Sequence, residues 1–65
     1  MSPLQAIDQQ IEQNQKDWIQ VSKAWNLAWY YSNEQEMEEL DLRIHSLERA
    51  QRTLKALRSE LEVIA

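Results

Sequence analysis

Tyr31-Ser32-Asn33-Glu34 is the stretch that decides the fold, because it separates two long segments with helical periodicity. Both Ser32 and Asn33 are residue types that cap helix N-termini, and each has a Gln or Glu three residues later, as in a capping box. Acidic residues follow the break, where the dipole of a helix favours negative charge. The stretch therefore predicts a turn at residues 32–33 and a helix over residues 34–64.

Apolar residues on both sides of this turn recur at alternating steps of three and four. Before the turn they are Leu4, Ile7, Ile11, Trp18, Val21, Trp25 and Ala28, with one polar gap at Asn14. After it they are Met37, Leu40, Ile44, Leu47, Leu54, Leu57, Leu61 and Ile64. This heptad spacing is typical of helices that pack along one seam. Ser2 and Pro3 suit a helix start, so we expect the first helix over residues 3–31.

The two seams match when the chain is folded back at its turn. In an antiparallel hairpin, residues equally distant from the turn face one another. The predicted pairs are Leu4–Leu61, Ile11–Leu54, Trp18–Leu47, Val21–Ile44, Trp25–Leu40 and Ala28–Met37. Ile7 is paired with Leu57, because position 58 is Arg. The sequence thus predicts an all-α, coiled-coil-like antiparallel two-helix hairpin that forms one domain over residues 1–65.

Polar residues support the same register. Asn14, the polar position of the first seam, faces Gln51, a polar position of the second. A polar layer of this kind fixes register in coiled coils at some cost in stability. Asp8 and Lys55 flank the same side of the seam, and we expect them to interact across it.

Composition excludes several classes of function. The chain has no Cys and no Gly, a single His at position 45 and a formal net charge of −4. One His cannot build a metal site, and no oriented catalytic partner for it can be found. We therefore expect no enzyme activity, no cofactor and no metal. With no apolar run long enough for a membrane span, the sequence predicts a complete, soluble, cytoplasmic protein.

A second apolar stripe, which shares Leu57 and Ile64 with the seam, predicts self-association. Ala50, Leu57 and Ile64 are spaced seven apart, and together with Leu42 they form the predicted dimer interface. Such a stripe exceeds what an isolated hairpin needs, so we expect a homodimeric four-helix bundle. Residues 34–41 are acidic and residues 43–58 are rich in Arg. If the second helix packs antiparallel to the second helix of another copy, the acidic residues of each copy lie next to the basic residues of the other. The expected architecture is similar to Rop-type dimeric bundles, although no motif of that family is present.

Five aromatic residues lie in the first helix and at its end. We expect Trp18 and Trp25 to belong to the core. Trp29, Tyr30 and Tyr31 are adjacent at the turn and cannot all face one core. Because Trp, Tyr and Arg concentrate binding energy at interfaces, these three residues and Arg49 form the predicted partner-binding site. The alternative is that the aromatic residues close the open end of the bundle.

Three functions remain open at this stage. The first is a small protein-binding module, a dimeric regulator, inhibitor or adaptor that docks on a larger protein, in the manner of small phage or plasmid proteins. The second is a Rop-like RNA-binding dimer that uses the basic middle of the second helix, although the acidic net charge disfavours nucleic acid. The third is a structural assembly segment.

Overall fold

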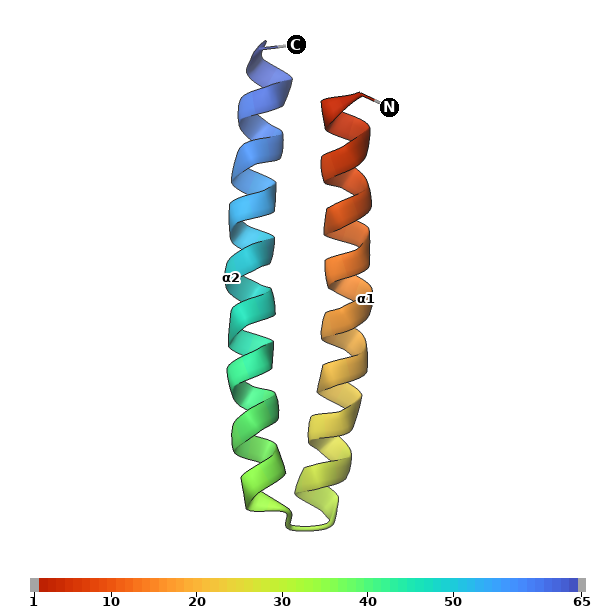
Figure 1. Ribbon diagram of the computed structural model, residues 1–65, viewed down its shortest axis with the longest axis vertical. Helices are drawn as coiled ribbons and strands as arrows, with labels where there is room; N and C mark the ends of the chain where they lie inside the picture. The colour runs from red at the N-terminus through yellow and green to blue at the C-terminus, as the bar shows by residue number, and fades with distance from the viewer. Residues whose placement is uncertain (1, 65) are drawn as a thin grey trace.

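Two antiparallel helices form the whole of the described structure. The computed structural model describes residues 2–64, with α1 at Pro3–Tyr30 and α2 at Glu34–Ile64. The helices lie side by side, joined at one end by a short turn, and both chain ends lie at the opposite end (Figure 1). The molecule measures 49 × 17 × 11 Å. The predicted all-helical hairpin is confirmed.

Helix α1 begins with the capping box that the sequence predicts. The backbone N–H of Gln5 donates to Ser2 Oγ at 3.2 Å, and the backbone N–H of Ser2 donates to Gln5 Oε1 at 3.1 Å. Two backbone donors that a helix start leaves unpaired are thereby satisfied. Pro3, which has no N–H to lose, occupies the first helical position.

The turn ends α1 with a Schellman motif. The N–H of Asn33 donates to the carbonyl of Ala28 at 2.8 Å, and that of Ser32 donates to the carbonyl of Trp29 at 3.1 Å. This motif needs a left-handed residue, usually Gly, and Ser32 takes that conformation with φ of 56°. Of the two predicted caps, Asn33 is the one used, since its Oδ1 accepts from the N–H of Glu36 at 3.2 Å. Tyr31 caps α1, so the helix ends one residue earlier than expected.

The hairpin alone has very little core. Within residues 2–64, only Val21 and Ala28 are buried, at 5% and 4% exposure. Most other seam residues are half-buried, because one neighbouring helix covers only one side of each helix. The exposed seam residues are Trp18, Leu57 and Ile64. Trp18 corrects the expectation of a core residue, since its side chain is 41% exposed. Trp25, which also has a seam position, is half-buried, so α2 covers the two indoles to different extents.

The polar layer forms as predicted. Asn14 Nδ2 donates to Gln51 Oε1 at 2.8 Å and to the backbone carbonyl of Leu47 at 2.9 Å. Both side chains are half-buried. One amide therefore bridges α1 to α2 through two hydrogen bonds, which fixes the register of the hairpin.

Two details of the predicted pairing are wrong near the chain ends. Asp8 pairs with Arg58, whose Nε donates to Asp8 Oδ1 at 2.5 Å, and not with Lys55. Arg58 also forms an ion pair with Glu62. The pKa of the Arg58 guanidinium is raised, mainly by its hydrogen bond to Asp8. Arg58 is half-buried whereas Leu57 is 44% exposed, so position 58 occupies the seam. The long aliphatic stem of Arg can cover apolar surface while its charge reaches water.

Candidate functional site

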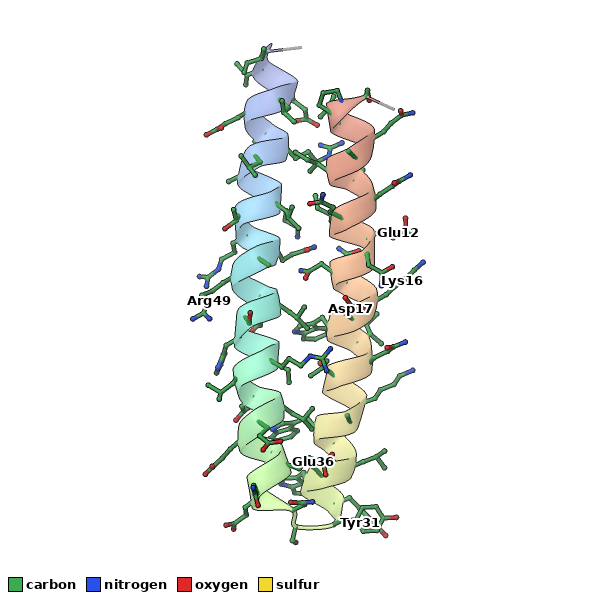
Figure 2. The ribbon with its side chains drawn as sticks, in the orientation of Figure 1. Glu12, Lys16, Asp17, Tyr31, Glu36 and Arg49 are labelled. Atoms are coloured by element: carbon green, nitrogen blue, oxygen red, sulfur yellow. The ribbon has the colours of Figure 1, made fainter. Side chains whose placement is uncertain are left out.

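Three exposed aromatic residues surround the turn. Tyr30 and Tyr31 are 74% and 73% exposed, and Trp29 is also exposed. The two tyrosine rings meet edge to face, with centroids 5.2 Å apart and planes at 86°. Figure 2 shows Tyr31 projecting outward beside the turn. This tip cluster, defined as Trp29, Tyr30 and Tyr31, offers adjacent aromatic area that the hairpin itself leaves in solvent.

The structure does not bring Arg49 to the tip cluster. Arg49 lies on the outer side of α2, well away from Tyr31 (Figure 2). It comes fifteen residues after Glu34, which is about 22 Å along a helix at ~1.5 Å per residue. Arg49 is therefore not part of the tip cluster, and the structure does not bring the four predicted partner-binding residues together.

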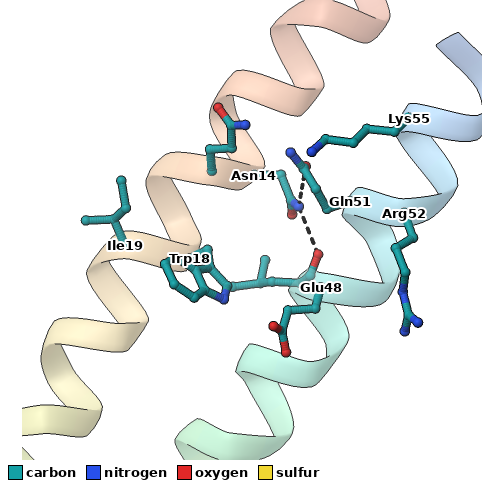
Figure 3. Close-up of a pocket in the computed structure, with 9 residues that line it drawn as sticks. Asn14, Trp18, Ile19, Glu48, Gln51, Arg52 and Lys55 are labelled. Carbon is teal, nitrogen blue, oxygen red and sulfur yellow. Dashed lines mark hydrogen bonds between the residues drawn. The ribbon is translucent and has the colours of Figure 1, made fainter. Parts of the chain in front are cut away.

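A groove runs between the helices at mid-length and was not predicted. It has a volume of about 720 Å³ and includes Trp18 and Ile19 from α1 and Leu47 from α2. Ile19 is 47% exposed, so the floor and one wall of the groove present apolar side chains to water. Figure 3 shows Trp18 of α1 and Gln51 and Lys55 of α2 directed toward the space between the helices, while Ile19 and Arg52 lie at its outer edges.

The other wall of the groove is polar. Gln51 Nε2 is buried and has no hydrogen-bond partner, although Gln51 Oε1 accepts from Asn14. Arg52 and Lys55 also line the groove, and neither forms an ion pair with any residue in the described part of the chain. The groove thus combines an apolar wall, an unpaired amide donor and two cations. The sequence gives only a weak signal for the groove. Ile19 is an apolar residue next to a seam position, and only the structure shows that the side chain of Trp18 is exposed in the groove.

The residues of the predicted dimer interface are exposed, but they do not form one line. Ala50, Leu57 and Ile64 are exposed and lie one heptad apart along α2. Leu42 is exposed as well, but it lies one heptad before Arg49, on the outer line of the helix. Arg43 lies one heptad before Ala50, so it belongs to the same line of α2 as Ala50, Leu57 and Ile64. Arg43 borders a shallow hollow together with Asp17 and Ala24. This hollow and the groove lie on opposite sides of the seam. The role of Ala50, Leu57, Ile64 and Leu42 as a dimer interface stays a prediction.

The basic residues of α2 do not form a single track. Arg58 is in the seam, Arg43 borders the shallow hollow, and Arg52 and Lys55 line the groove. Arg49 points outward from the pair of helices (Figure 2). A phosphate backbone needs cations along one surface, and here they are spread around the helix.

Residues 2–64 contain no group of three or more His, Cys, Asp or Glu side chains placed to hold a metal ion. His45 is exposed on α2. Neither described helix is apolar enough over a sufficient length to cross a membrane. Comparison with protein-family models, curated proteins and solved structures finds no match for this chain. The tip cluster and the groove are therefore the two surfaces on which a function can be argued.

Proposed function

We propose that this chain is a protein-binding module that acts as a homodimeric four-helix bundle and docks on a larger protein through its tip cluster. The observation that carries the proposal is the imbalance between buried and exposed apolar residues. Among residues 2–64 two residues are buried, whereas large apolar side chains are exposed at Trp18, Ile19, Leu27, Trp29, Tyr30, Tyr31, Leu42, Leu57, Val63 and Ile64. Contiguous exposed apolar area on a small protein marks sites that other molecules cover.

Dimerisation follows from the size of the core. A chain of this length has a small core and marginal stability, and disulfides, a metal or self-association are the usual additional sources of stability. It contains no Cys. A second hairpin would cover one broad face and turn the half-buried seam residues into a core shared by four helices.

The tip cluster supports docking on protein. Trp and Tyr carry much of the energy at protein interfaces, because they bury a large area and keep a polar atom for hydrogen bonding. Tyr30 and Tyr31 are not required by the hairpin, since Tyr forms helix less readily than Ala or Glu. The acidic net charge and the scattered basic residues favour a protein over nucleic acid.

The test compares two variants of the full chain. Tyr30→Ala/Tyr31→Ala removes both tyrosine rings of the tip cluster, and Val63→Ala removes an exposed apolar side chain at the other end of the hairpin. Each protein is immobilised and exposed to lysate of the source organism in high salt, with and without nuclease treatment. We expect one protein to be captured by the native chain and by Val63→Ala, and at least tenfold less of it by the tyrosine variant.

Helicity and mass decide how that loss is interpreted. The tyrosine variant should keep its circular dichroism signal and, by light scattering, a mass of about twice the 7.8 kDa chain. If the variant melts or becomes monomeric, the tyrosines belong to the fold and the docking surface lies elsewhere. Capture that disappears after nuclease treatment would instead indicate RNA binding.

A further inference from the structure

The charges beside the groove fall on one continuous stripe along α2. Its members recur at steps of three and four, immediately beside the seam: Glu38, Asp41, His45, Glu48, Arg52 and Lys55. Glu48, Arg52 and Lys55 line the groove, which fixes the side of the hairpin on which this charged stripe lies. The stripe is acidic at Glu38, Asp41 and Glu48 and basic at its last two positions. No member has an ion-pair partner among residues 2–64.

This order of charges is self-complementary when the stripe is reversed. A two-fold axis perpendicular to α2, at the level between Ser46 and Leu47, brings residues equally distant from that point together. Glu38 then faces Lys55 of the second copy, and Asp41 faces Arg52 of the second copy. His45 faces Glu48 of the second copy in the same register. No like charges meet, and the symmetry repeats every pair.

The apolar wall of the groove lies at the same level. Trp18 is as far from the turn as Leu47, so Trp18 and Ile19 lie beside the midpoint of the charged stripe. The same axis that pairs the charges would therefore bring the exposed Trp18 and Ile19 of both copies together at the centre of the interface. An apolar centre with charges at its edges is the usual anatomy of a specific interface.

The available area is sufficient. The broad face of the hairpin measures 49 Å by 17 Å, which is roughly 800 Å² and close to the area that each partner buries in a standard specific interface. We infer that the groove face is the dimer interface: a second copy packs on it with α2 against α2 in antiparallel orientation, centred between Ser46 and Leu47. This inference rests on the proposed dimer and places it on the groove face instead of the Ala50–Leu57–Ile64 stripe.

Two charge-reversed variants test the register. The acid-reversed variant, Glu38→Lys/Asp41→Lys, sets Lys against Lys55 and Arg52 of the second copy. The base-reversed variant, Arg52→Glu/Lys55→Glu, sets Glu against Glu38 and Asp41 of the second copy. Each should raise the dissociation constant of its own homodimer at least tenfold in low salt. The difference should shrink at high salt, because exposed charges are screened.

An equimolar mixture of the two variants makes the test specific. In the mixed dimer every reversed position meets an opposite charge, so its dissociation constant should return to within about threefold of the native value. Recovery on mixing also shows that both variants fold. The control is Glu39→Lys/Glu60→Lys, which makes the same change in net charge on a different side of α2 and should leave the native dimer intact.

Sedimentation equilibrium and circular dichroism of the full chain give the outcomes. A native dimer that both variants retain, or that the mixture does not restore, overturns the groove interface while leaving the proposed dimer and tip surface standing. A control variant that dissociates as far as the acid-reversed one shows a net-charge effect and also overturns the register. A native chain that stays monomeric up to millimolar concentration overturns the dimer itself.

Discussion

The Asn14–Gln51 layer gives the prediction that the structure defines most sharply. Asn14→Leu alone removes both interhelical hydrogen bonds, each worth ~1 kcal/mol net, and leaves the Gln51 amide with neither polar atom paired. A half-buried Leu recovers ~1 kcal/mol of this through apolar burial. We therefore expect the single change to lower the free energy of unfolding by ~1 kcal/mol, the balance of those two contributions.

Changing both residues reverses the sign. Asn14→Leu/Gln51→Leu loses the same two hydrogen bonds, but two half-buried leucines together contribute ~2 kcal/mol. The unpaired Gln51 Nε2 disappears as well, and a buried unpaired donor costs ~1–3 kcal/mol. The double variant should therefore be more stable than the native chain by ~1–3 kcal/mol, with each kcal/mol raising Tm by about 4–8 °C for a domain of this size.

Thermal and urea unfolding of the native chain, both single variants and the double variant complete the cycle. All four should be measured at one protein concentration, because the stability of a dimer depends on it. The coupling between the two positions should be ~1 kcal/mol, because the Asn14–Gln51 hydrogen bond is the one contribution that both single variants remove. A double variant less stable than the Asn14→Leu single variant would refute the reasoning, and would indicate that these amides hold another polar group.

Three further predictions concern the turn and the two candidate dimer faces. Ser32→Gly should raise the free energy of unfolding by ~1 kcal/mol, since Gly takes a left-handed φ without steric cost; a lower urea midpoint would contradict this. Asn33→Ala should lower the free energy of unfolding by ~1 kcal/mol, because α2 loses its N-terminal cap, and urea unfolding measures this loss as well. Leu57→Asp should leave the dimer mass unchanged if the groove is the interface, whereas dissociation in light scattering would favour the Ala50–Leu57–Ile64 stripe.

The hairpin could be predicted from the sequence because its determinants are local or periodic. Capping by Ser2 and Asn33 depends on residues three positions apart, and both caps form. The register follows from distance to the turn, and the hydrogen bond between Asn14 and Gln51 confirms it. Patterns of this kind need no knowledge of how much surface each side chain finally buries.

The errors arose where the packing and reach of single side chains decide the outcome. Trp18 has a seam position but stays 41% exposed and lines the groove, whereas Trp25, also at a seam position, is half-buried. Arg58 was excluded from the seam as a charged residue, yet its stem packs there and its guanidinium reaches Asp8. Arg49 was joined to the tip cluster by residue type alone, and the length of α2 separates them (Figure 2).

The two proposed surfaces fit one assembly. Trp29 lies two heptads after Gln15, which lines the groove, so both residues are on the same side of α1. A second copy on the groove face would therefore cover part of the Trp29 ring. Tyr30 and Tyr31 follow on other sides of α1 and would stay exposed. Because the two-fold axis reverses the helices, the two tyrosine pairs of the dimer would lie at opposite ends of the bundle. The dimer would then bind two partner molecules, or two sites on one partner, with the avidity that such linkage provides.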